Sequence, residues 1–294
     1  MRSVRLAAAL AAALLVLAGC GSSDSGSSSS SSASSSTATS ANAADKCTKD
    51  QLQTRSPGTL TVATDKPAFP PYFEDNDPTN GRGFESAVAY AIAQKLGYAK
   101  SDVKWTTEPF NSSYAPGPKK FDFDVNQISI TPARAKRVDF STPYFTAPQA
   151  LVALKSSDAA KATSLADLAN TKLGVQIGTT SLDAVNQVVK PSAQPKVFND
   201  SNDVVTALKQ KQVDAVVVDL PTAFFITAVQ VPNGKIVGQF PTIGSQEYFG
   251  MVLAKDSPLT ECVNEALAHL KDSGELSQIQ QTWLSDKVSA PVLQ

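Results

Sequence analysis

Histidine, cysteine and tryptophan are scarce in this sequence, which has one His, three Cys and two Trp among 294 residues. The single histidine, His269, stands in a late helical stretch, so catalysis by a histidine general base has no candidate beside the polar segments described below. No group of side chains has metal-ligand spacing, and we expect no metal, no cofactor and no catalytic residue. An excess of positive charge is also missing, because 26 Lys and Arg balance 27 Asp and Glu, which argues against nucleic acid as a partner.

The N-terminus has the pattern of a secretory signal. Arg2 and Arg5 precede an apolar run from Leu6 to Leu17, which is shorter than the roughly 20 residues of a membrane-spanning helix. The run closes on Leu17-Ala18-Gly19-Cys20, which resembles a bacterial lipobox and implies cleavage before Cys20 and attachment of a lipid to its thiol. A simple signal peptide with a chance cysteine is the alternative. We predict a signal peptide over residues 1–19 and a periplasmic or other extracytoplasmic protein, lipid-anchored to the outer face of the cell membrane.

Residues 20–45 are dominated by serine and offer little apolar surface to bury, so we expect a disordered tether between the lipid and the folded body. The body then contains the two remaining cysteines, Cys47 and Cys262. In an oxidising compartment two such thiols predict one disulfide, and two unrelated buried thiols are the alternative.

The body alternates strands with helices, which predicts an α/β fold with largely parallel sheets covered on both faces. Two segments share one scheme of base, apolar residue, Asp and strand: residues 119–126 and 211–218. We interpret this repeated pattern as evidence for two lobes of similar construction. Residues 149–154 would carry the chain into the second lobe and residues 248–254 would bring it back, so two crossings form a hinge. The predicted lobes are 46–148 plus 246–294, and 149–245. The predicted strands and helices are 60–64, 84–96, 121–130, 173–177, 182–189, 204–211 and 215–218.

Polar side chains gather where the predicted strands end, which is where open α/β sheets bind ligands. Arg134 offers a planar fork of donors for a carboxylate, Thr179 and Thr180 begin a helix whose amides favour an anion, and Asp219 suits an ammonium group. Together these groups describe the head of an α-amino acid. Each has a structural alternative: Arg134 as a solvated side chain, and the threonines and Asp219 as helix caps. The candidate ligand-binding residues are Asp65, Phe69, Phe110, Gln127, Ser129, Arg134, Thr179, Thr180 and Asp219.

Asp65 is the hardest of these to explain structurally, because no helix follows it that it would cap. Phe69 and Phe110 could hold a side chain between aromatic faces, although aromatic residues more often belong to a core. Asp65 disfavours an acidic ligand side chain by repulsion and favours an amide or a cation.

From Leu60 to about Trp283 the sequence resembles the extracellular solute-binding proteins, family 3, which serve polar amino acid importers. The matching segments are Ala63-Thr64-Asp65, Phe69-Pro70-Pro71, Gly83-Phe84, residues 128–141 with Arg134, residues 164–168, Gly178-Thr179-Thr180, residues 214–219 and Gly274-Glu275-Leu276 through Trp283-Leu284. The resemblance implies a two-lobe, type II periplasmic-binding fold. It implies that Arg134, Ser129 and Thr180 hold the ligand carboxylate, Asp219 the ammonium, and Asp65, Phe69 and Phe110 the side chain.

The sequence also departs from the family pattern. Glu85 replaces the usual Asp, Lys66 is an extra residue, Asn126-Gln127 is bulkier than usual, and residues 111–118 are rich in Pro and Gly where a helix is common. The function that follows is a monomeric substrate-binding lipoprotein of an ABC importer, which captures glutamine or a basic amino acid by hinge closure. The alternatives are a periplasmic dehydratase-type enzyme on the same fold, with Glu85 as a candidate acid, and a ligand-sensing module for a receptor.

Overall fold

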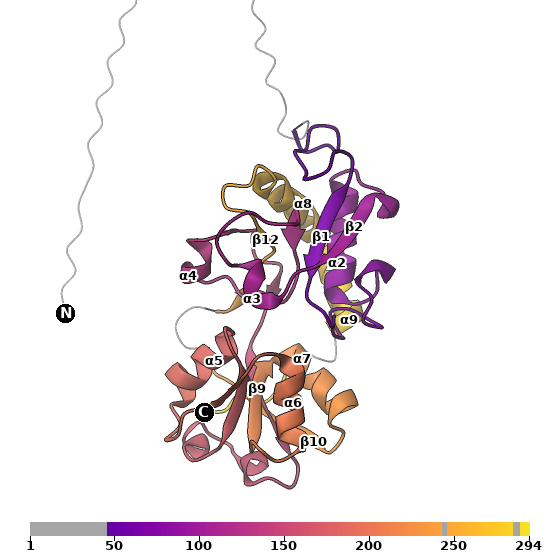
Figure 1. Cartoon of the computed structure of the whole chain (residues 1–294). Helices are drawn as coiled ribbons and strands as arrows, with labels where there is room; N and C mark the ends of the chain where they lie inside the picture. The colour runs from indigo at the N-terminus through magenta and orange to yellow at the C-terminus, as the bar shows by residue number, and fades with distance from the viewer. Residues whose placement is uncertain (1–45, 243–245, 285–288) are drawn as a thin grey trace, which may run out of the picture. The chain divides into compact units, whose positions relative to one another are not determined.

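The computed structural model describes residues 46–242, 246–284 and 289–294. Two five-stranded sheets organise this part of the chain, in the orders β2-β1-β3-β12-β4 and β10-β6-β9-β7-β8 (Figure 1). The predicted signal peptide, Cys20 and the predicted tether lie outside the described residues. In the part of the chain that is described, no helix combines the length and the apolar character needed to cross a membrane.

The first sheet belongs to the first lobe and receives strands from both ends of the sequence. Its strands β1, β2 and β3 run parallel, and β12 returns antiparallel between β3 and β4. Their bounds are β1 Leu60–Thr64, β2 Val103–Thr107, β3 Phe123–Asp124, β4 Asp139–Phe140 and β12 Val252–Leu253. The helices of this lobe are α2 Phe84–Lys95, α3 Phe110–Ser113, α4 Pro132–Ala135, α8 Thr260–Asp272 and α9 Glu275–Leu284.

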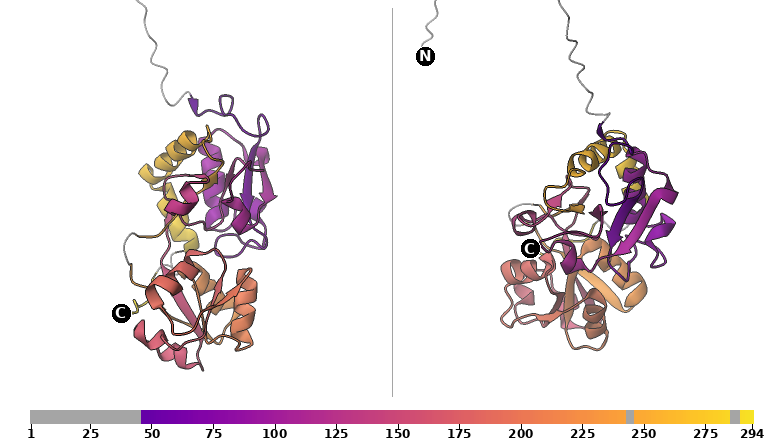
Figure 2. Two further views of the ribbon diagram at one scale, coloured as in Figure 1. Left: turned by 60° about the vertical axis from the view of Figure 1, so that its left-hand side comes forward. Right: turned by 45° about the horizontal axis from the view of Figure 1, so that its top comes forward.

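Helices from opposite ends of the sequence share the first core. Apolar side chains of α2, such as Phe84, Val88 and Ile92, pack with those of α8 and α9 in one buried cluster. Figure 2 shows the same proximity, with the yellow C-terminal helices beside the indigo N-terminal elements. The disulfide joins Cys47 to Cys262 of α8, which confirms the predicted pairing.

The second sheet has apolar side chains on both faces, as expected for a sheet covered by helices. Along β6, Ala150 and Val152 belong to one cluster and Leu151 and Ala153 to another, because successive side chains point to opposite faces. Helices α6 and α7 lie on one side of β9 and α5 on the other (Figure 1). The bounds are β6 Gln149–Leu154, β7 Leu173–Gln176, β8 Lys196–Phe198, β9 Ala215–Asp219, β10 Gly234–Gln239, α5 Thr180–Ala184, α6 Ser201–Lys209 and α7 Leu220–Phe225, with π-helical turns Val185–Val189 and Ile226–Gln230.

The crossings between the lobes run side by side. Strand β5, Phe145–Thr146, pairs antiparallel with β11, Tyr248–Phe249, and the amide of Ala147 donates to the Glu247 carbonyl at 3.1 Å. The crossing strand β6 is antiparallel to both of its neighbours, so each sheet combines parallel and antiparallel pairs.

Two details differ from the expectations. The predicted strand over residues 121–130 shrinks to Phe123–Asp124, because Gln127 adopts a left-handed backbone with φ 49° that interrupts an extended chain. The last residues pack on the second lobe and not on the first, because Leu293 is buried in a cluster with β7 and β9 and its amide donates to the Gln239 carbonyl at 2.9 Å.

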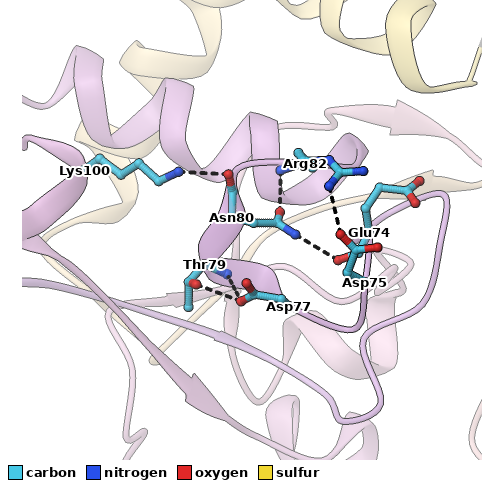
Figure 3. Close-up of polar contacts among 7 residues, drawn as sticks. All are labelled: Glu74, Asp75, Asp77, Thr79, Asn80, Arg82 and Lys100. Atoms are coloured by element: carbon cyan, nitrogen blue, oxygen red, sulfur yellow. Dashed lines mark hydrogen bonds and ion pairs between the residues drawn. The ribbon is translucent and has the colours of Figure 1, made fainter.

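A loop in the first lobe, residues 74–82, is held by its own polar side chains (Figure 3). Asp77 accepts from both the amide and the hydroxyl of Thr79, at 2.9 and 2.7 Å, and Lys100 donates to the Asn80 carbonyl at 2.8 Å. The remaining bonds of this network run from Asn80 Nδ2 to the Glu74 carbonyl, from the Arg82 amide to Asn80 Oδ1 and from Arg82 to Asp75. Asn76 of the same loop accepts from the Ala68 amide at 2.7 Å and so supports the segment that lines the cavity described next.

Candidate functional site

A cavity of about 400 Å³ lies between residues of the two lobes. Its size falls in the range of small-molecule sites, about 300–1,000 Å³. Every predicted binding residue except Arg134 lines it: Asp65, Phe69, Phe110, Gln127 and Ser129 from the first lobe, and Thr179, Thr180 and Asp219 from the second. The structure therefore brings together residues that are up to about 150 positions apart in the sequence.

Asp65 follows β1 and contacts the start of a helix elsewhere in the chain. Its carboxylate accepts from the Lys66 amide at 2.6 Å and from the Phe110 amide at 3.2 Å. Phe110 is the first residue of α3, so Asp65 does have a helix end to stabilise, contrary to the expectation from its own segment. These bonds also fix the direction of the Asp65 carboxylate beside the cavity.

Arg134 lies behind the cavity wall and not in it. Its guanidinium donates to the carbonyl of Ser129 at 2.7 Å and to the carbonyl of Gly178, in the second lobe, at 2.8 Å. Its charge also faces the rings of Tyr114 and Phe110, with centroids at 4.3 and 5.5 Å. Arg134 is 6% exposed, so the interpretation of a merely solvated side chain is wrong.

The two threonines at the start of α5 have different roles. The Thr179 hydroxyl accepts from the Leu182 amide at 3.2 Å and donates to the Gln176 carbonyl at 2.8 Å, so it caps the helix. The Thr180 hydroxyl instead points across to the first lobe, 3.2 Å from the Ser129 hydroxyl, and donates to Glu247.

Asp219 stands directly before α7 but makes no side-chain cap to that helix. Its carboxylate accepts from Gln149 Nε2 at 2.8 Å. Burial raises the pKa of Asp219 well above its ordinary value, the charge of Glu247 raises it further, and the bond from Gln149 acts in the opposite direction. Asp219 lines the cavity, so a cation entering there would stabilise the charged form of its carboxylate.

Gln149 and Glu247, which come from the two crossings, are functional candidates absent from the predicted set. The Gln149 amide donates to Glu247 at 3.0 Å as well as to Asp219, and its oxygen accepts from the Ser181 hydroxyl at 2.6 Å. Nothing in the local sequence of either residue marks a site. The signal that could have found them is the pair of predicted crossings, residues 149–154 and 248–254: Gln149 begins the first, and Glu247 directly precedes the second.

Glu85 lies beneath the cavity and does not line it. It is fully buried in α2, accepts from the Gln127 amide at 2.8 Å, and is also hydrogen-bonded by the Gln127 side chain and the Tyr144 hydroxyl. Burial raises the pKa of Glu85 to about 7, although these hydrogen bonds oppose the shift. Glu85 therefore holds Gln127 in its left-handed conformation at the cavity wall.

A two-lobed α/β body with paired crossings and a polar cavity between the lobes defines a type II periplasmic-binding protein. The sequence pattern of bacterial extracellular solute-binding proteins, family 3, matches residues 60–286, and the chain belongs to this family. The arginine-binding extracellular protein ArtP of Bacillus subtilis is 30% identical over 220 residues, which cover 72% of this chain and 82% of ArtP.

Solved structures agree with this assignment. An ancestral arginine-binding protein bound to glutamine is 35% identical, with a TM-score of 0.65 over 77% of this chain and 97% of the other. An ancestral amino acid-binding protein, described as a precursor of cyclohexadienyl dehydratase, is 31% identical, with a TM-score of 0.64 over 77% of this chain and 95% of the other.

Proposed function

We propose that this protein captures a basic amino acid outside the cell membrane and delivers it to the permease of an ABC importer. The observation that carries the proposal is the cavity between the lobes, with Asp65 on one wall and Asp219 on the other. Among the charged side chains of the described residues that line it, Asp65, Asp200 and Asp219 are acidic and Lys66 is basic. This balance favours a ligand with a cationic side chain over glutamine, the other ligand that the sequence favoured.

The proposed roles follow the chemistry of the walls. Asp219 takes the α-ammonium group, and the hydroxyls of Ser129 and Thr180 take the α-carboxylate. Arg134 places its positive charge behind that carboxylate, and its bond to the Ser129 carbonyl holds the backbone that carries the Ser129 hydroxyl. Asp65, Phe69 and Phe110 hold the cationic side chain, with the aromatic faces against its stem or charge. Gln127 and Thr179 complete the walls.

Thermal unfolding of the full chain in the presence of each of the twenty amino acids tests the proposal. A ligand at about 1,000 times its dissociation constant adds roughly 4 kcal/mol to the free energy of unfolding, which corresponds to a shift of several degrees. L-arginine and L-lysine are expected to give the largest shifts. No shift with any amino acid, from a sample that unfolds cooperatively, would refute the proposal.

The variant Asp219→Asn tests the site itself. Loss of one partner of a buried charge pair costs about 2–5 kcal/mol, so the affinity for L-arginine should fall at least about 30-fold. The matched control is Asp256→Asn, whose carboxylate is exposed and does not line the cavity. Titration calorimetry measures the affinity of both variants for L-arginine. Equal affinities in the two variants would show that Asp219 does not bind the ligand.

A dehydratase activity is the second candidate, because one structural neighbour is described as a precursor of such an enzyme. Glu85 is a poor catalytic acid in this protein, since it is fully buried and does not line the cavity. Binding without turnover is therefore the proposed activity. Conversion of prephenate by the purified protein would contradict the proposal of binding without turnover.

The proposal includes a lipid on Cys20, a tether over residues 20–45, and a monomer that contacts the permease; a receptor partner in place of the permease is the alternative. The supporting observation is the lipobox-like sequence Leu17-Ala18-Gly19-Cys20. Cell fractionation of a Cys20→Ser variant tests the anchor: the protein should leave the membrane fraction, and a variant that stays there would contradict the lipid.

A further inference from the structure

We propose that Glu247 is a specificity-determining residue whose carboxylate competes with the α-carboxylate of the ligand for the same hydroxyl groups. The inference rests on the proposed function and adds a feature of this chain to it. Glu247 comes from the crossing that returns to the first lobe, and its side chain reaches the point where both lobes meet.

The contacts of Glu247 are those expected of a bound carboxylate. Ser129 Oγ donates to Glu247 Oε1 at 2.5 Å, and Thr180 Oγ1 donates to the same oxygen from the other lobe. Gln149 Nε2 donates to Glu247 Oε2 at 3.0 Å. Donors from the first lobe, the second lobe and the outgoing crossing therefore converge on one carboxylate.

Ser129 and Thr180 cannot serve Glu247 and a ligand carboxylate together. Each hydroxyl has a single O–H to donate. The two hydroxyl oxygens are only 3.2 Å apart, so two carboxylates that accepted from both would bring like charges into contact. Ligand binding through these hydroxyls must therefore displace the Glu247 side chain.

The surroundings of Glu247 leave room for this displacement. Its side chain is partly exposed and borders a second cavity of about 720 Å³, which shares Thr180 with the ligand cavity. Asp219 lies on the ligand side, linked to Glu247 through Gln149. Once a bound cation stabilises the charged form of Asp219, its repulsion favours movement of Glu247 toward the second cavity and away from the first.

This arrangement distinguishes cationic ligands that carry a carboxylate from those that do not. An α-amino acid competes with Glu247, whereas an amine without a carboxylate does not. L-arginine and agmatine, which is arginine without its carboxylate, are therefore the discriminating probes. We expect Glu247→Ala to strengthen arginine binding at least about tenfold, the equivalent of about 1.4 kcal/mol. Agmatine binding should stay the same or weaken, because the variant removes a negative charge near the cavity.

Titration calorimetry of the full chain, wild type and variant, with both probes measures this difference. Glu247→Gln is the second variant, because its amide oxygen can still accept from both hydroxyls without a charge, and a smaller gain for arginine is expected. Glu261→Gln, an exposed carboxylate in α8, is the control and should change neither affinity.

Unchanged or weaker arginine binding in both Glu247 variants, with cooperative thermal unfolding, would overturn the inference and leave the proposed function standing. An equal gain for agmatine would overturn it too, since the effect would not depend on a carboxylate. If no amino acid binds to wild type or variant, the proposed function fails, and the inference fails with it.

Discussion

At the scale of single residues, Asp124 has an unusual position for a carboxyl group. It is fully buried in β3, and neither of its oxygens accepts a hydrogen bond of ordinary geometry. Burial raises the pKa of Asp124 to about 8, with the nearby Ser113 hydroxyl opposing the shift only in part. The unfolded chain releases this proton near pH 4, whereas the folded chain keeps it to about pH 8. The free energy of unfolding therefore falls as pH rises between these values.

We predict that Asp124→Asn raises the melting temperature at pH 8 and has little effect at pH 4. The neutral amide avoids a cost of about 1.4 kcal/mol for each pH unit in this window, and about 1 kcal/mol shifts melting by roughly 2–4 °C in a body of this size. Melting curves across this pH range, with Asp256→Asn as an exposed control, measure the effect. Equal melting temperatures at pH 8 would show that Asp124 is not buried as a neutral acid.

Residue chemistry at strand ends predicted most of the cavity wall, because a short strand followed by a polar residue places that residue at a known edge. Asp65 and Asp219 are such residues, and both line the cavity. The role of Gln149 could not be predicted in this way, because its neighbours in the chain are apolar and its partner Glu247 lies 98 positions away. The buried position of Arg134 was also hidden, since it depends on a carbonyl of the other lobe.

At the scale of elements, the turn between β7 and α5 is where the second lobe meets the first. The Gly178 carbonyl accepts from Arg134 at 2.8 Å and from the Tyr114 hydroxyl at 3.1 Å. Gly178 has φ +77°, and a Cβ there would collide with the side-chain ends of Asn111 and Tyr114. Any side chain at this position would therefore push these two side-chain ends aside and disturb the bond from Tyr114 to the turn.

We predict that Gly178→Ala weakens ligand binding at least about tenfold, or about 1.4 kcal/mol, because closure must then displace Asn111 and Tyr114 from the positions in which they contact the turn. Gly274→Ala is the matched control, since Gly274 has the same φ of +77° but nothing within 4 Å of its Cβ position. Both variants should lose similar stability from the left-handed backbone. If calorimetry gives both the same affinity, the turn does not limit closure.

Elements with a plain hydrophobic period were predictable, and those set by partners elsewhere in the fold were not. Strand β1 and the start of α2 are found as expected, because Leu60 and Phe84 begin regular apolar patterns. The end of β3 depends on Gln127, whose backbone is held by Glu85 from a different element. The position of Leu293 on the second lobe depends on pairing with Gln239, a contact that no local pattern encodes.

At the scale of the whole molecule, stability and ligand binding should be separable through the disulfide. Cys47 and Cys262 close a loop of 215 residues, and both pack in or against the core of the first lobe, away from the residues that line the cavity. Replacing both by serine should reduce the free energy of unfolding by about 2–5 kcal/mol, because the unfolded chain regains freedom. Affinity for the ligand should stay the same, since the cavity walls keep their supports. Melting curves and calorimetry on the same sample measure both quantities. A loss of affinity at a temperature where the variant is fully folded would mean that the disulfide also positions the first lobe for closure.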